Sequence, residues 1–246
     1  MSHLCCSNIF FIRKMPHFRL YAEVETGTIQ YVTTKNVVGI IHDIGACIHT
    51  KMDYLTELDS PVGDGDHGVN LDRGFQEVLH RLNGVEDEDL GSILEFTGST
   101  LLSTTGGASG ALYGTAFQRA SYTCRGKYSV GIDEIAQLFQ AAEEGIVNIG
   151  NARLGDKTIL DVLHPAAEAA EEARSKHCDL IQGFEEIVSA AESGLEKTKG
   201  LVARRGRAMY LGERAMGHYD VGAASLCLIL RSTLETLKRI DVQPCD

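Results

Sequence analysis

Three absences narrow the class of protein that this sequence can encode. No apolar run approaches the roughly 20 residues of a membrane-spanning helix, and residues 5–12, CCSNIFFI, lack the length and charged start of a secretory signal. None of the seven cysteines forms a Cys-x-x-Cys pair, and their odd number and scattered positions predict reduced thiols in a cytoplasmic protein. Basic residues are few, 23 against 34 acidic ones, and the formal charge of −11 argues against nucleic acid or an acidic membrane as a general partner.

Signals for β-strands are also scarce, and they are confined to the N-terminal part. Residues 18–34, FRLYAEVETGTIQYVTT, are rich in β-branched and aromatic residues around Gly27, which is compatible with a hairpin or with a disordered extension. We therefore expect residues 1–32 to be an extension of unknown role and residues 33–246 to form one helical domain.

Helical periodicity fills the rest of the chain. In the first such segment, Val37, Val38, Ile41, Ile44 and Ile48 have the spacing of one helix face. Eight segments show this pattern, at about residues 35–52, 69–82, 88–104, 111–122, 131–150, 158–176, 179–199 and 222–240. Because the connections are mostly short, neighbouring helices should run antiparallel, which predicts an all-α, eight-helix bundle or barrel. Pro165 predicts either a kink in the sixth segment or a helix that starts just before it.

An acidic, glycine-rich stretch, LDSPVGDGDHGVN at residues 58–70, separates the first two segments. An isolated Asp-Gly pair is usually a surface turn, but here Asp59, Asp64 and Asp66 lie five and two residues apart on a backbone that glycines make flexible. Three converging carboxylates repel one another and favour a bound cation. The spacing does not match an EF-hand, and only His67 is near enough to add a zinc-type ligand. Magnesium fits best, since it combines a few carboxylates with water and substrate phosphates.

A second glycine-rich stretch, STTGGASGALYG at residues 103–114, precedes the fourth helical segment. Glycines often end helices, so an ordinary helix connection is one interpretation. The other is a phosphate cradle, in which free backbone N–H groups at the positive end of a helix and the Ser109 hydroxyl face an anion.

The segment GNARLGDKT, residues 150–158, has a superficial likeness to a Walker A loop. Asp156 stands between Gly155 and Lys157, and a helix rather than a strand precedes the segment, so a P-loop NTPase is rejected. We expect Asp156 to cap the next helix and Lys157 to pair with a carboxylate.

A long segment, RRGRAMYLGERAMGHYDVGAAS at residues 204–225, lies between the last two helices. Loops of this length are unusual unless functional. It holds four arginines, which could meet phosphates or carboxylates or form ordinary exposed ion pairs: Arg204, Arg205, Arg207 and Arg214. Asp220 precedes the last helix and is expected to cap it.

Taken in order, the motifs LD, GDGDHG, GGASG, GDKT.LD and GRA..LGERA.GH.D.GA.S resemble those of the nucleotide-binding L subunit of dihydroxyacetone kinases, over about residues 34–240. The resemblance implies a barrel of eight antiparallel amphipathic helices that binds ADP or ATP at one rim through two magnesium ions. It implies metal ligands at Asp59, Asp64 and Asp66. It implies nucleotide contacts at His67, Gly68, Val69, Asn70, Gly107, Ala108, Ser109, Gly150, Ile159, Arg207, Asp220, Val221 and Gly222.

The same resemblance implies that the chain works with partners. In such kinases a separate K subunit holds the ketose through a histidine, and this chain offers no candidate for that histidine. The phosphoryl donor is either a phosphohistidine protein of the phosphotransferase system, the M subunit, or free ATP. The ketose, dihydroxyacetone or a ketotetrose such as erythrulose, stays open, and so does a homodimer. Two other functions stay open as well: a nucleotide-binding regulatory protein without catalysis, and a metal-dependent phosphohydrolase.

Overall fold

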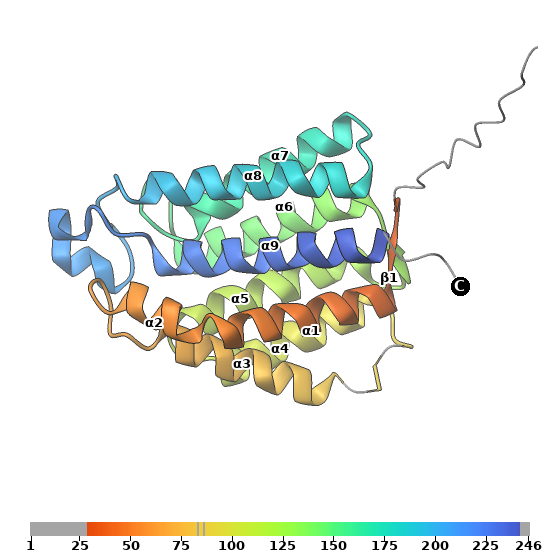
Figure 1. Ribbon diagram of the computed structural model, residues 1–246, viewed down its shortest axis with the longest axis horizontal. Coiled ribbons are helices and arrows are strands. Elements are labelled where there is room, and N and C mark those ends of the chain that lie inside the picture. Colours follow the sequence, from red (N-terminus) through yellow and green to blue (C-terminus); the bar gives the residue numbers. More distant parts are fainter. Residues whose placement is uncertain (1–28, 83, 86, 242–246) are drawn as a thin grey trace, which may run out of the picture.

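The computed structural model describes residues 29–82, 84–85 and 87–241, and most of them are helical (Figure 1). The α-helices are α1 (Thr34–Thr50), α2 (Met52–Asp59), α3 (His67–Arg81), α4 (Leu90–Thr104), α5 (Gly107–Ser121), α6 (Ile132–Gly150), α7 (Leu160–Ser175), α8 (Leu180–Thr198) and α9 (Val221–Asp241). Two 3₁₀ segments, η1 (Tyr122–Cys124) and η2 (Arg207–Ala215), and a two-residue ladder of β1 (Val32–Thr33) and β2 (Ser129–Val130) complete it.

The long helices form a closed ring. Contacts run from α1 to α3 and then through each successive helix to α9, which packs back against α1. Successive long helices run in opposite directions along the molecule (Figure 1). The predicted all-α fold is confirmed, and all eight expected segments are helical. The described residues hold one more α-helix, the short α2, which continues α1 after a break at Lys51.

Side-chain caps explain where several helices begin. Thr33 and Asn36 form a capping box at the start of α1. Asp89 accepts a hydrogen bond from the Ser92 amide at the start of α4, and Asp179 caps α8 in the same way. Helix α7 starts at Leu160 and continues through Pro165, so the proline does not end it.

The core lies inside the ring and is built from one face of each helix. Ile48, Leu55, Phe75 and Ile187 are fully buried. Helices α4 and α5 approach closely at Gly98, where an added Cβ would lie only 2.7 Å from the Gly114 carbonyl oxygen. Apolar side chains also line an internal cavity of about 210 Å³.

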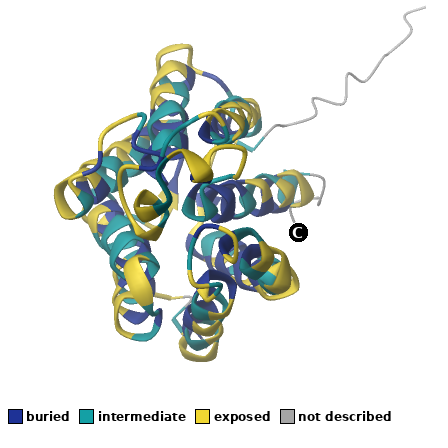
Figure 2. Ribbon diagram, turned by 90° about the vertical axis from the view of Figure 1, so that its left-hand side faces the viewer, coloured by how far each residue is buried: buried dark blue, intermediate teal, exposed yellow. Residues whose placement is uncertain are grey.

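The two ends of the ring differ. The β1–β2 ladder lies at one end, where Val32 pairs with Val130 and is buried, and where the Ile29 amide donates to Asp241. The hairpin interpretation of residues 18–34 falls mostly outside the described residues. The loops that carry the sequence motifs lie at the opposite end, which faces the viewer in Figure 2. Among the described residues, no helix is long and apolar enough to cross a membrane. Within the same part of the chain, Cys47, Cys124, Cys178 and Cys227 are free thiols.

Candidate functional site

A cavity of about 330 Å³ opens among the loops at this end of the ring. Its walls come from segments far apart in the sequence: the α2–α3 loop, the start of α5, the α6–α7 connection, and the long segment before α9. Of the sixteen residues that the resemblance assigns to metal and nucleotide, those that line the cavity are Asp59, Asp64, Asp66, His67, Gly107, Ala108, Ser109, Gly150, Ile159, Arg207, Asp220, Val221 and Gly222.

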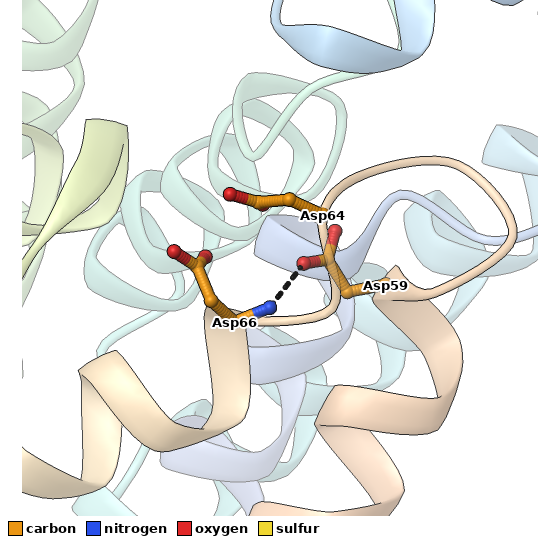
Figure 3. Close-up of side chains that lie close together, drawn as sticks. All are labelled: Asp59, Asp64 and Asp66. Carbon is orange, nitrogen blue, oxygen red and sulfur yellow. Dashed lines mark hydrogen bonds between the residues drawn. The ribbon is translucent and has the colours of Figure 1, made fainter.

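The three aspartates all line this cavity, and their side chains lie close together (Figure 3). Each offers one carboxylate oxygen, and these oxygens all lie within 4.8 Å of one another. Asp59 ends α2 and is buried, while Asp64 and Asp66 are exposed. The local backbone fixes Asp59, because its Oδ2 accepts hydrogen bonds from the amides of Asp66 (3.1 Å) and His67 (3.3 Å).

The acidic loop, residues 59–66, depends on glycine for this geometry. A Cβ on Gly63 would lie 2.0 Å from Asp59 Oδ1, so any side chain there would displace the carboxylate. The Gly63 amide also donates to the Asp59 carbonyl at 2.6 Å. The cluster offers three hard oxygen donors close together and no cysteine, and two of its three carboxylates are exposed. Such a set of ligands fits magnesium.

The glycine-rich stretch, residues 103–114, does not form a long loop, because most of it belongs to the first turns of α5. Helix α5 begins at Gly107, four residues before the start expected from the sequence, and Gly107 has a φ of +67°, which favours glycine. Ala108 and Ser109 therefore lie in the first turn, where N–H groups have no partner inside the helix and the helix dipole is positive. This turn can receive a phosphate group.

A buried hydrogen-bond chain connects this turn to α3 and α9. His67 Nδ1 is 3.0 Å from Ser109 Oγ, and His67 Nε2 is 2.9 Å from Ser225 Oγ. Ser225 Oγ is in turn 2.7 Å from the Tyr113 hydroxyl. Burial lowers the pKa of His67 to about 4, although the nearby Asp59 carboxylate acts in the opposite direction. His67 is therefore neutral at physiological pH and orients Ser109 through hydrogen bonds.

Part of the cavity wall is apolar and is named here the apolar slot. Leu112, Ile146, Ile149 and Ala152 line it beside Gly150. These residues have the helical spacing of core residues, so nothing in the sequence alone distinguishes them from packing positions. A flat aromatic base is the kind of group that such a slot can hold.

The long segment before α9 closes the opposite wall. Residues 199–220 link α8 to α9 and are named here the arginine loop. Arg207 Nη1 lies 2.7 Å from Asp64 Oδ2, which joins this loop to the acidic cluster. Asp220 accepts a hydrogen bond from the Ala223 amide at 2.8 Å, which confirms the predicted cap of α9. Burial raises the pKa of Asp220 to about 7, and the carboxylates of Asp161 and Asp59 act in the same direction.

Two predictions about the α6–α7 connection are wrong. Asp156 does not cap α7. Its carboxylate accepts from the Arg153 amide, whereas Asp161 accepts from the amides of Gly155 and Thr158 just before the helix. Lys157 has no carboxylate among its hydrogen-bond partners within the described residues. It is 1% exposed and donates to backbone carbonyls instead.

Three of the residues that the resemblance assigns to the nucleotide, all within the part of the chain that the structure describes, do not line the cavity. Gly68 packs against α2, where a Cβ would lie 2.1 Å from the Met52 carbonyl, and Val69 is 48% exposed. Asn70 accepts a hydrogen bond from Arg73 at 2.8 Å, and a Cβ on Gly106 would lie 2.8 Å from its Oδ1. Their contribution to ligand binding stays a prediction.

Comparison with known families matches residues 61–235 to the DAK2 domain. The chain is 40% identical over 195 residues to the PEP-dependent dihydroxyacetone kinase, ADP-binding subunit DhaL, of Escherichia coli (strain K12), and the match covers 79% of this chain and 93% of that protein. It is 33% identical over 187 residues to the triokinase/FMN cyclase of Homo sapiens, covering 76% of this chain and 32% of that protein.

A solved structure has a similar fold. It is the dihydroxyacetone kinase from C. freundii in complex with AMP-PNP and Mg²⁺, with a TM-score of 0.61 and 24% sequence identity. The likeness covers 92% of this chain and 38% of that one.

Proposed function

The chain belongs to the DAK2 domain family, and from this premise we propose that it is the nucleotide-binding, phosphoryl-transferring subunit of a dihydroxyacetone kinase. One observation carries the proposal: three carboxylates and the first turn of α5 line the same cavity. Anionic ligands for a metal and amide donors for an anion have opposite charge requirements, and a metal-bound polyphosphate satisfies both.

Each part of the site then has a distinct role. Asp59, Asp64 and Asp66 would hold magnesium, in two ions as the resemblance implies, and the bound metal would offset the negative charge of the phosphates. The amides of Ala108 and Ser109 bind and orient the phosphate chain, with His67 fixing the serine side chain. The slot beside Gly150 holds the base, and Arg207 supplies a second cation opposite the carboxylates.

The ketose is proposed to be held by a K subunit. That Escherichia coli relative is described as an ADP-binding subunit of a PEP-dependent kinase, which favours a phosphohistidine protein as the phosphoryl donor. In this reading ADP stays in the cavity and is recharged there.

The proposal is tested with the purified chain, magnesium, a K subunit and either ATP or the phosphotransferase-system proteins. We expect dihydroxyacetone phosphate to form and Asp64→Ala to lower the rate at least about a hundredfold, because the variant loses transition-state charge neutralisation. Asp133→Ala, at the exposed start of α6, is the matched carboxylate control and should keep the rate.

Two results would replace this function. Tight nucleotide binding without transfer beside several K subunits would indicate a regulatory protein. Release of free phosphate from ATP by the chain alone, again dependent on Asp64, would indicate a phosphohydrolase.

A further inference from the structure

Among the residues that the structure describes, Lys157 has one of the largest fully buried side chains, and a lysine is rarely so deeply buried. Its φ of +61° lies in the left-handed region, which a residue with a side chain adopts only at a cost. Glycine would relieve that strain at once. The lysine side chain must therefore provide something that glycine cannot.

The ammonium group makes contacts that all end on one segment of the chain. Nζ lies 2.7 Å from the His218 carbonyl, 2.8 Å from that of Ala215, 2.9 Å from that of Thr198 and 3.3 Å from that of Leu201. Thr198 ends α8, and the other three belong to the arginine loop. Leu201 lies before η2, Ala215 is the last residue of η2, and His218 follows it. One cation thus joins the two ends of a loop that leaves and re-enters the ring.

The neighbouring residue, Asp156, contacts the same loop at other positions. The Asp156 carbonyl accepts a hydrogen bond from the Arg204 amide at 2.9 Å, and its carboxylate lies 3.5 Å from Arg205 Nε. Inside the arginine loop the Gly217 amide donates to the Lys199 carbonyl at 2.8 Å, which draws the loop ends together. The turn at residues 156–157 therefore binds the arginine loop at several positions along its length.

These contacts leave the ammonium group unsuited to bind phosphate directly. It has three hydrogens and four carbonyl oxygens within hydrogen-bond distance, so its donors are already used. Its charge instead satisfies carbonyls that folding removes from water.

We propose that Lys157 is a positioning residue that holds the arginine loop closed over the cavity, so that Arg207 and Asp220 stand at the nucleotide. The role of those two residues rests on the proposed function, but the closure of the loop by Lys157 does not. Without the ammonium group, the buried contacts to the Thr198 and Ala215 carbonyls and the part-buried contacts to the Leu201 and His218 carbonyls are lost, and the loop should open while the helices remain.

Limited proteolysis with trypsin, which cleaves after arginine and lysine, reports the opening of this loop. The loop contains Arg204, Arg205, Arg207 and Arg214. In nucleotide-free protein, Lys157→Met should be cut within this loop at least about tenfold faster than the unaltered chain, because cleavage follows the population of the open form. Lys157→Gln, which keeps two donor hydrogens but no charge, should give an intermediate rate. Lys176→Met removes a surface lysine that pairs with Glu172 and should leave the rate unchanged.

A second measurement separates positioning from general stability. At a temperature where circular dichroism shows equal helix content, magnesium–ADP should bind Lys157→Met about tenfold more weakly than the unaltered chain. Equal cleavage and equal affinity in the variant would overturn the proposal, and so would loss of the entire helical signal. If the unaltered chain binds no magnesium nucleotide, the proposed function fails, and the trypsin result still decides the role of Lys157.

Discussion

The acidic loop and the arginine loop line the same cavity and touch through Arg207 and Asp64, yet they are held in different ways. The acidic loop is fixed by its own few residues, through the Gly63 amide on the Asp59 carbonyl and the Asp66 amide on the Asp59 carboxylate. The arginine loop takes its shape largely from residues some forty to sixty positions earlier in the chain, at Asp156 and Lys157.

This difference determines how each loop should respond to change. A locally determined loop fails when one of its own residues is altered, and the failure stays confined to that loop. A loop fixed from elsewhere tolerates changes within it but opens when its distant attachment is lost. The following predictions test this contrast, beginning with the largest effect.

The largest effect is expected from Gly63→Ala. The added methyl group would lie 2.0 Å from Asp59 Oδ1 and must push the carboxylate away from its two partners. We expect magnesium-dependent nucleotide affinity, measured by calorimetry, to fall at least about a hundredfold, as when the support of a metal ligand is removed.

Gly39→Ala is the matched control. Gly39 lies in α1 with nothing within 4 Å of the added carbon, so affinity should not change and stability should rise by up to about 1 kcal/mol. Unchanged affinity in Gly63→Ala would show that the acidic loop is not held by this close contact.

A smaller effect is expected from Arg207→Gln. Arg207 and Asp64 form an ion pair whose side chains are 66% and 32% exposed, so its loss should move the melting temperature by no more than about 2 °C. Nucleotide affinity should nevertheless fall about tenfold, since the charge-assisted contact to phosphate that we propose for Arg207 is lost.

Arg125→Gln, an exposed arginine paired with Glu95, controls for the loss of one positive charge. A large drop in melting temperature for Arg207→Gln would mean that the arginine loop is held mainly by its ion pair with the acidic loop and not by Asp156 and Lys157.

The smallest effect concerns pH. The folded-state pKa of Asp220 is raised to about 7 from its ordinary value of 3.8, so the folded protein binds the proton more tightly than the unfolded chain between these values. The resulting stabilisation is present below about pH 4 and is lost as pH rises through 7. Asp220 lines the open cavity and stays partly solvated. The free energy of unfolding should therefore change with pH by well below about 1.4 kcal/mol per pH unit, the value for one whole proton bound only by the folded state.

Asp220→Asn removes the titrating carboxyl group while keeping an oxygen that accepts from the Ala223 amide. Urea unfolding between pH 5 and 8 should therefore show the unaltered chain losing stability relative to the variant. Parallel curves would contradict the raised pKa.

Much of the fold follows from residue spacing. The apolar faces identify all eight long helices, and the cap at Asp220 is identified correctly, whereas the cap expected at Asp156 is not formed. Helix α2 is missed because its eight residues run directly into the acidic loop and give too short a pattern. The start of α5 is placed too late because glycines have low helix propensity, whereas tertiary packing requires one at Gly110, against the Thr105 carbonyl.

The candidate site shows the same limit. The convergence of Asp59, Asp64 and Asp66 can be anticipated because all three lie within eight residues. The apolar slot and the Tyr113–Ser225 contact cannot, since their parts come from different helices and resemble core residues. Lys157 is misassigned for this reason: its partners are carbonyls, which any residue provides, so no sequence pattern marks them.

The central claim is that the acidic loop binds the phosphates of a nucleotide through a divalent cation. Calorimetric titration of the chain with ADP, with magnesium and then with excess chelator, tests it most directly. The account predicts binding that is strong with magnesium and at least about a hundredfold weaker without it. Equal affinity under both conditions would contradict the account.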